Sequence, residues 1–373
     1  MNNKPGLLLV ANWDSDVGYA WWLIEGFWAK IAEHLGQRYQ IYLAYPSISK
    51  VPSVIQAAPI ELVEYNCKDF SPRNISSHLS WLRKHRIEVI YFTDRPFISP
   101  YYPLFRMAGV KHIISHDHTP GERSPSRGWK KLVKILLARS PASVDLAMVT
   151  TDYLRQRAMA TACIPEHKCK VAANGIAPVQ VNRQLSREEL GLPLEGRLIV
   201  TAARANYYKG IDFAIELFAQ VAELHPDCYY LVLGDGPHLD DFKDQAKELS
   251  LAERVIFKGR VEGVANYLQH CQIAVHPSKG EVGYCLAILE YMQAGLPVMV
   301  PNNPAVCGAT RDGVDGLRYQ QGDLRDARSK LLRYLDTPDL AREHGLQARQ
   351  QITQQFSLEQ THNSLLQALR QHL

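Results

Sequence analysis

The sequence SKGEVGYCLAILEYMQAGLPV, residues 278–298, contains two glutamates, Glu281 and Glu290, around a glycine-containing helix start. Apolar segments that read as strands lie directly before it, at Ile273–His276, and at its end, at Val298–Val300. A strand, a glycine turn, a helix and a second strand are the elements with which α/β proteins present backbone N–H groups to a phosphate. Carboxylates accept hydrogen bonds from sugar hydroxyls, so this stretch predicts a site for a nucleotide-linked sugar.

Length and composition indicate a folded protein of two domains. The chain has 373 residues, 46% hydrophobic and 21% charged, and single hydrophobic cores stop growing at roughly 250–300 residues. Seven scattered cysteines without a CxxC pair or a common zinc pattern favour a reduced, cytoplasmic protein. The apolar run near the N-terminus is too short for a signal peptide, and no run of about 18 apolar residues is present to span a membrane.

Charge is unevenly distributed along the chain. Residues 1–187 hold 24 Lys and Arg against 14 Asp and Glu, whereas residues 188–373 hold 18 against 24. A basic first half predicts that this half faces an anionic partner other than a nucleic acid. The alternative is an uneven surface charge without a role.

The first half alternates short apolar strands with amphipathic helices, which implies βαβ units and a parallel sheet. Strands are expected at Gly6–Ala11, Gln40–Tyr45, Glu88–Phe92, Lys111–Ser115 and Asp145–Thr150. Helices are expected at Ala20–Leu35, Ile75–Lys84, Tyr102–Ala108, Gly128–Ala138 and Thr151–Met159.

The second half repeats the alternation, with further strands at Leu198–Ala203, Tyr229–Leu233 and Val255–Lys258 and helical segments from Leu324 onward. The predicted fold is therefore α/β, with two Rossmann-like, doubly wound domains at residues 1–180 and 181–355. Such sheets bind ligands at the carboxyl ends of their strands, so the two domains are expected to face a cleft and share one ligand there.

Two cations follow the strand at Leu198–Ala203. Arg204, Lys209 and Gly210 lie between that strand and the next helix, where the helix N-terminus adds to an anion site suited to a diphosphate. Two exposed loop cations are the alternative.

Glu290 lies within an apolar helix. It is expected to accept hydrogen bonds from a ribose diol, or else to face solvent.

Loops in the first half supply further candidates. His116 and His118 end a strand, and one of them is expected to reach the cleft and bind a hydroxyl; the alternative is two solvated loop histidines. No third ligand accompanies this HxH sequence, so no metal is expected. Asp16 and Gly18 lie in a loop before the first helix that is expected to face the same cleft.

Residues 123–139 form a short basic amphipathic segment that contains a tryptophan. Such a segment suits an interface with anionic lipid headgroups, and a core helix with a charged outer face is the alternative. The residues expected at the lipid surface are Arg123, Arg127, Trp129, Lys130, Lys131 and Lys134.

Together these motifs resemble the family 4 retaining glycosyltransferases, which have the GT-B fold. Nearly all of the second half is similar: Arg204 with Lys209-Gly210, the Gly234-Asp-Gly-Pro turn, residues 255–260, and the stretch 283–298. Two features depart from the family pattern. Glu281 lies nine positions before Glu290, where the family usually has eight, and near the N-terminus Gly18 alone matches a pair of glycines.

The resemblance implies roles for these residues. Arg204, Lys209, Glu281 and His116 would be catalytic, and Asp16 and His118 would bind the acceptor. The nucleotide-sugar donor, a UDP- or GDP-sugar, would bind to Gly18, Gly210, Gly234, Arg260, Gly283, Tyr284, Cys285, Leu286 and Glu290. The final helix, within residues 356–373, would cross back to the first domain.

The resemblance also implies an activity: metal-independent, retaining transfer of a sugar to a glycan or lipid-linked acceptor in surface polysaccharide or lipopolysaccharide biosynthesis, without a cofactor. We expect the protein in the cytoplasm, peripherally on the inner face of the cytoplasmic membrane. The alternatives are a nucleotide-sugar epimerase of the GT-B fold and a non-catalytic GT-B module that binds a partner.

Overall fold

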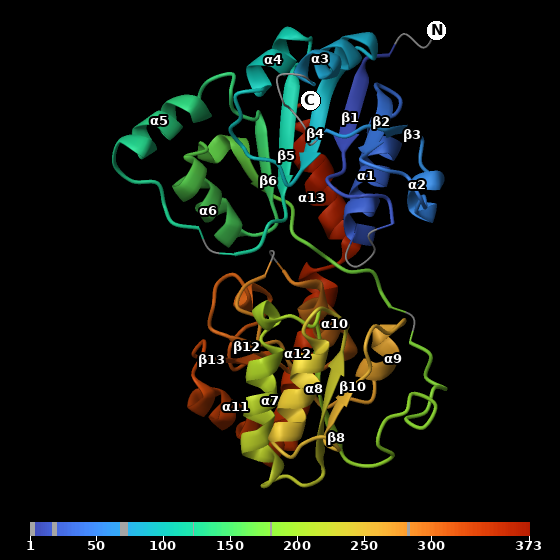
Figure 1. Cartoon of the computed structure of the whole chain (residues 1–373), viewed down its shortest axis with the longest axis vertical. Coiled ribbons are helices and arrows are strands. Elements are labelled where there is room, and N and C mark those ends of the chain that lie inside the picture. Colours follow the sequence, from blue (N-terminus) through green and yellow to red (C-terminus); the bar gives the residue numbers. More distant parts are fainter. Residues whose placement is uncertain (1–3, 17–20, 68–73, 122, 180, 282–283) are drawn as a thin grey trace. The chain divides into compact units, whose positions relative to one another are not determined.

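A computed structural model describes residues 4–16, 21–67, 74–121, 123–179, 181–281 and 284–373. The chain divides into two compact units (Figure 1). Unit 1 comprises residues 1–119, 123–173 and 361–373, and unit 2 comprises residues 120–122 and 174–360. No helix within the described ranges is long and apolar enough to cross a membrane.

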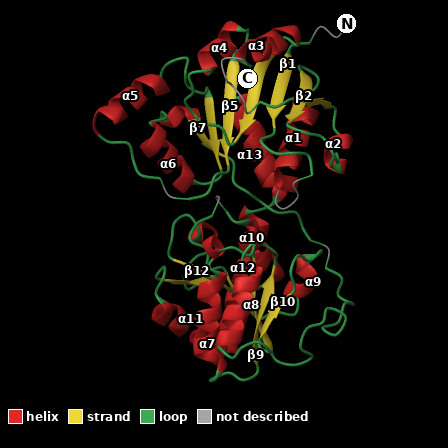
Figure 2. Cartoon of the chain, in the orientation of Figure 1, coloured by secondary structure: helices red, strands yellow, loops and turns green. Residues whose placement is uncertain are grey.

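Unit 1 is built on a seven-stranded parallel sheet in the order β3-β2-β1-β4-β5-β6-β7. The strands are β1 Gly6–Val10, β2 Gln40–Tyr45, β3 Glu61–Glu64, β4 Ile87–Thr93, β5 His112–Asp117, β6 Leu146–Val149 and β7 Cys169–Val171. The helices of this unit are α1 Trp21–Leu35, α2 Ser53–Gln56, α3 Ile75–Lys84, α4 Tyr102–Met107, α5 Gly128–Ala138 and α6 Asp152–Ala162. Figure 2 shows this sheet between its helices.

The last helix, α13 Leu358–Arg370, lies mostly in unit 1 although it follows all of unit 2 in the chain. Its His362 ring packs edge-on against Phe27 of α1. Arg370 contacts His34, and Arg38 donates a hydrogen bond of 2.8 Å to the carbonyl of Leu373. The C-terminal segment is thus fixed to the end of α1.

Unit 2 contains a six-stranded parallel sheet in the order β10-β9-β8-β11-β12-β13. The strands are β8 Arg197–Ala202, β9 Cys228–Leu233, β10 Val255–Phe257, β11 Ile273–Val275, β12 Val298–Pro301 and β13 Gly316–Tyr319. The helices are α7 Ile211–Ala222, α8 Leu239–Glu248, α9 Val264–Leu268, α10 Leu286–Ala294, α11 Leu324–Asp336 and α12 Pro338–Gln355. The predicted α/β class with two doubly wound sheets is confirmed.

Alternation along the strands of unit 2 divides its core into two layers, because successive side chains of a strand point to opposite faces. In β8, Ile199 packs with α7, α8 and α11 on one face, whereas Leu198 and Val200 pack with α9, α10 and α12 on the other. Both faces are therefore covered, as a parallel sheet requires.

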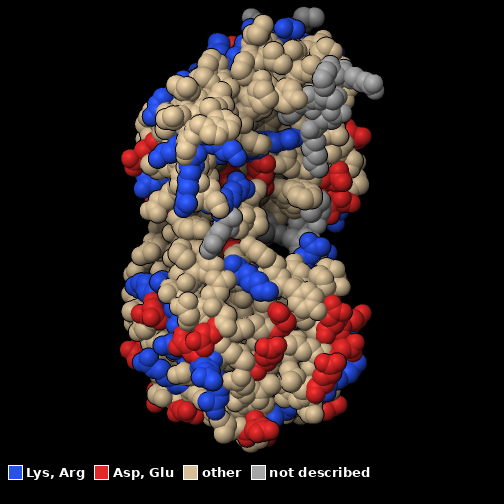
Figure 3. Space-filling view, turned by 60° about the vertical axis from the view of Figure 1, so that its left-hand side comes forward, with Lys and Arg blue, Asp and Glu red and all other residues tan. Residues whose placement is uncertain are grey.

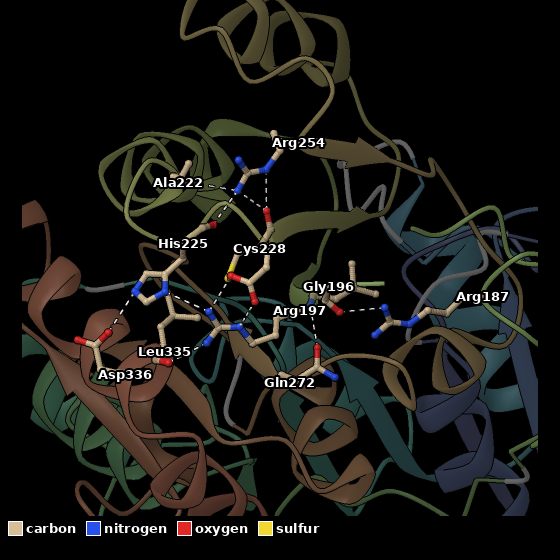
Figure 4. A network of polar contacts seen from close by, with 12 residues as sticks. Arg187, Gly196, Arg197, Ala222, His225, Cys228, Arg254, Gln272, Leu335 and Asp336 are labelled. Carbon is tan, nitrogen blue, oxygen red and sulfur yellow. Dashed lines mark hydrogen bonds and ion pairs between the residues drawn. The ribbon is translucent and has the colours of Figure 1, made fainter. Parts of the chain in front are cut away.

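Arginines secure the amino end of this sheet (Figure 4). Arg197, the first residue of β8, bonds to Asp227 at 2.7 Å and to the carbonyl of Leu335 at 2.7 Å. Arg254 donates to the carbonyls of Cys228 and His225. This network ties together loops at the end of the sheet opposite to the carboxyl ends of the strands, so we interpret it as structural.

Candidate functional site

The loop after β8 positions Lys209 through a short, capped turn. The side chain of Asn206 accepts a hydrogen bond of 3.1 Å from the backbone N–H of Lys209. Gly210 follows with φ +70°, and a Cβ there would lie 2.3 Å from the carbonyl oxygen of Pro277. Only glycine fits this close approach between the β8 and β11 loops, so the backbone of Lys209 is held beside residues 276–281.

Lys209 forms an ion pair with the buried carboxylate of Glu281, and the Lys209 side chain itself is 22% exposed. The Lys209 Nζ lies 2.6 and 2.7 Å from the two carboxylate oxygens. His276, directly after β11, contacts the same carboxylate through Nε2 at 2.8 Å. His276 is 1% exposed and Glu281 is 6% exposed, so little water competes for these contacts.

The pKa values within this network follow from burial and charge together. Burial would lower the pKa of Lys209, but Glu281, Cys285 and Tyr208 together outweigh it and raise the pKa. Burial would likewise lower the pKa of His276, yet Cys285 and Glu281 raise it to about 9. Burial would raise the pKa of Glu281, but Lys209 and His276 hold it well below its usual range. Glu281 is therefore a carboxylate between two cationic groups.

Other residues predicted to bind the donor lie at the same carboxyl edge of the sheet. Gly234 directly follows β9 with φ +139°, and a Cβ there would meet the carbonyl oxygen of Ala203 at 2.0 Å. Arg204 and Arg260 follow β8 and β10 and are exposed. Both arginines thus lie at the edge of the sheet where ligands of parallel α/β sheets bind.

Residues 284–286 lead into α10. The ring of Tyr284 packs on Phe356, with the ring centroids 4.7 Å apart, and its carbonyl accepts from Asn174. Cys285 is the N-cap of α10, and its Sγ lies 3.6 Å from His276 Nε2. Leu286 begins the helix. The predicted donor contact at Gly283 lies outside the described residues, as does the one at Gly18.

Glu290 lies in the second turn of α10 without a hydrogen bond or ion pair to any residue that the structure describes. Burial raises the pKa of its carboxyl to about 7. A carboxylate desolvated in this way is costly unless a ligand supplies hydrogen bonds.

Glu290→Gln should therefore stabilise the protein in a pH-dependent manner. In the folded state the pKa is about 7, against 4.5 for the free group. The wild-type free energy of unfolding should consequently fall as the pH rises from 4.5 to 7, because the unfolded chain ionises first, and then stay constant. We expect a gain in the variant on the order of 1–3 kcal/mol above pH 7. Urea unfolding at pH 4.5 and 8 measures it, with exposed Glu343→Gln as the control; an equal gain at both pH values would contradict the assignment.

The candidate residues of unit 1 form a buried histidine pair. His116 is 0% exposed, and its Nδ1 lies 2.6 Å from the hydroxyl of Tyr91. The His118 ring lies 4.0 Å from the His116 ring, and both stack on Phe27. Burial lowers the pKa of His118 to about 4 and holds that of His116 well below its usual value, so both are neutral. The alternative of two solvated histidines is therefore wrong.

Two further groups beside these sites, Asp94 and His276, are not among the site residues predicted from the sequence. Asp94, after β4, has φ +55° and accepts a hydrogen bond from the backbone N–H of His118. Burial raises the pKa of Asp94 to about 7. The sequence predicts His276 only as the last residue of a strand. Both residues lie at strand ends, and this position is the feature of the sequence that points to them. Asp16 is exposed in the loop after β1. Within the described part of the chain, no hydrogen bond or ion pair joins Asp16 to Asp94 or to His276.

Part of this chain is similar in sequence to known glycosyltransferases. Residues 182–351 match the family model described as glycosyl transferases group 1. An alpha-monoglucosyldiacylglycerol synthase of Streptococcus pneumoniae is 31% identical over 45% of this chain and 38% of its own length. An uncharacterized glycosyltransferase of Haemophilus influenzae is 26% identical over 52% of this chain and 55% of its own length. The chain thus spans about half or less of these curated relatives.

Solved structures resemble the whole chain. A glycosyltransferase from Rickettsia africae has a TM-score of 0.79 at 16% identity, over 99% of this chain and 98% of its own. Anabaena Alr3699/HepE in complex with UDP-glucose has a TM-score of 0.73 at 16% identity, over 98% of this chain and 99% of its own. These likenesses show that the chain has the GT-B fold, and its residues 182–351 match the glycosyl transferases group 1 family.

Proposed function

We propose that this protein is a retaining glycosyltransferase that moves a sugar from a UDP- or GDP-sugar to an acceptor hydroxyl. The observation that carries the proposal is the partly buried ion pair of Lys209 and Glu281 at the carboxyl edge of the unit 2 sheet. It lies within the region that matches the family model. The complex of HepE with UDP-glucose, in the same fold, supports a nucleotide-sugar as the donor.

In the proposed reaction, the acceptor oxygen forms a bond to the anomeric carbon on the face from which the diphosphate departs. The bond from that carbon to the phosphate oxygen breaks, and a phosphate oxygen takes the acceptor proton. Lys209 and Arg204 stabilise the negative charge that develops on the leaving diphosphate. Glu281 holds the ammonium of Lys209 in place, so little reorganisation is needed when the charge appears.

Two features of α10 support binding of the nucleotide. Its N-terminal backbone N–H groups and helix dipole favour a phosphate near Leu286. Glu290, one turn further along, has a desolvated carboxylate that can accept from two ribose hydroxyls. In this proposal the diphosphate binds at the first turn of α10 and the ribose at the second.

Thermal shift with UDP, GDP and their sugars, followed by mass spectrometry of the transfer product, tests this function. Either UDP and its sugars or GDP and its sugars should raise Tm. A ligand at 100 times its Kd adds about 2.7 kcal/mol to the free energy of unfolding. The product should retain the anomeric configuration of the donor. Stabilisation by none of the nucleotides would contradict the proposal, and isomerisation of the donor without an acceptor would support an epimerase.

For the acceptor, we propose a lipid-linked molecule reached at an anionic membrane surface through α5. Ala138 is the one residue of this helix that is buried. Trp129, Leu132 and Leu136, spaced three and four residues apart, are 70%, 64% and 72% exposed. An apolar stripe turned to solvent contradicts the alternative of a core helix with a charged outer face, and it suits insertion between lipid headgroups.

Basic residues accompany the apolar stripe of α5. Arg123 and Lys131 are exposed, and Lys134 is anchored to the carbonyl of Thr161 at 2.6 Å. Figure 3, in which the α5 side comes forward, shows Lys and Arg side chains gathered on unit 1. Each basic residue near an anionic surface contributes about 1 kcal/mol.

Replacing Trp129 and Leu136 together by Glu should lower binding to vesicles that contain phosphatidylglycerol by at least about tenfold, because both lost apolar contact and added negative charge oppose insertion. Co-sedimentation measures the partition. Leu346→Glu is a matched control, because Leu346 is 63% exposed in unit 2. Equal binding of the double variant and the control would refute a role for α5.

A further inference from the structure

Three potential metal ligands meet at the end of β11 and the start of α10. His276, Glu281 and Cys285 bring a ring nitrogen, a carboxylate oxygen and a thiol sulfur within 4.8 Å of one another. His276 and Glu281 are buried, and Cys285 is partly exposed. Among the residues that the structure describes, no second group of three such side chains comes as close. Nitrogen, oxygen and sulfur together are the donor atoms that Zn²⁺ binds.

The distances within this cluster fit a tetrahedral zinc centre. Bonds of about 2.3 Å from zinc to sulfur and about 2.1 Å to nitrogen place these two ligand atoms about 3.6 Å apart. The observed distance between Cys285 Sγ and His276 Nε2 is 3.6 Å. His276 Nε2 and Glu281 Oε1 are hydrogen-bonded at 2.8 Å, and they need to separate by about half an ångström to bind zinc.

We propose that His276, Glu281 and Cys285 bind Zn²⁺ through Nε2, one carboxylate oxygen and Sγ. Three protein ligands leave the fourth position open to water or an anion. Coordination displaces the protons of the thiol and of Nε2 to solvent. The ion is an inhibitor and not a cofactor, because it occupies the carboxylate that positions Lys209; this consequence, unlike the binding itself, rests on the proposed function.

Lys209 competes with the metal. Its ammonium contacts both oxygens of Glu281, at 2.6 and 2.7 Å. Zn²⁺ at this carboxylate would lie within a few ångströms of that ammonium, where two cations repel each other strongly in a buried site. Removal of the ammonium should therefore strengthen zinc binding while it weakens sugar transfer.

Titration of the metal-free full-length protein with Co²⁺, followed by displacement with Zn²⁺, tests the site. Wild type should show the thiolate-to-cobalt charge-transfer band and the intense visible bands of a tetrahedral centre. C285S should lose the charge-transfer band, and both C285S and H276Q should bind Zn²⁺ at least tenfold more weakly. H167Q, at an exposed histidine, is the control for weak surface binding. No charge-transfer band in wild type, or the same band in C285S, would overturn the proposal.

K209M provides a second, independent arm in case C285S or H276Q does not fold. It should bind Zn²⁺ at least tenfold more tightly than wild type, and weaker binding would overturn the competition. Zn²⁺ should inhibit wild-type transfer, and the turnover that C285S retains should be less sensitive to it. If no nucleotide-sugar is turned over, the proposed function fails while the cobalt spectrum still decides the metal site.

Discussion

Lys209→Ala should lower kcat for sugar transfer by on the order of 10²–10³-fold while leaving the fold intact. Removal of one preorganised donor to a developing negative charge has an effect of this size in other enzymes. Here the ammonium is held by both oxygens of Glu281, so it is oriented before the substrate arrives. Because the charge develops mainly as the bond to the diphosphate breaks, kcat should change more than KM.

Steady-state kinetics with the donor found by thermal shift measure this effect, and circular dichroism verifies the fold. Lys243→Ala is the matched control, because Lys243 pairs with Asp240 on the surface of α8. A Lys209→Ala enzyme with a kcat within threefold of wild type would falsify the assigned role. A raised KM with unchanged kcat would assign Lys209 to ground-state binding instead.

Glu281→Ala should lower the free energy of unfolding by about 3 kcal/mol at neutral pH, at the low end of the cost of breaking a buried ion pair. The change leaves the ammonium of Lys209 without its partner, and it removes one of the charges that keeps His276 protonated. The cost lies at the low end because His276 can release its proton and become neutral. For a unit of 150–250 residues this corresponds to a fall in Tm of about 6–12 °C.

The loss in free energy of unfolding caused by Glu281→Ala should depend on pH. The folded-state pKa of Glu281 is lowered from 4.5, so the stabilisation is fully present above pH 4.5 and is lost as the pH falls below that value. Urea unfolding at pH 7 and pH 3.5 should therefore show a smaller effect of Glu281→Ala in acid. Asp339→Ala is the control, since it breaks an exposed pair with Arg342 that contributes at most about 1 kcal/mol. Equal losses in both variants at pH 7 would refute a buried, structural pairing of Glu281.

Local sequence patterns predicted most elements of the fold. The strand expected at Gln40–Tyr45 is β2, and the helix expected at Gly128–Ala138 is α5. β3 and β13 were not predicted: each has four residues, and both are edge strands that lie beside β2 and β12. A segment this short becomes a strand because of its neighbour, and the neighbour is distant in sequence.

The sequence by itself determined the α/β alternation, the donor-binding motifs and the basic, apolar character of residues 123–139, because each is a local pattern of residue types. It placed Glu281 one position away from the family spacing. Only the tertiary structure decided that Glu281 meets Lys209, 72 residues earlier in the chain, and that His276 and Cys285 join the same cluster. It also decided that the apolar stripe of α5 faces solvent. These contacts depend on which strands lie side by side and on how each loop turns, and neither is encoded within a single segment.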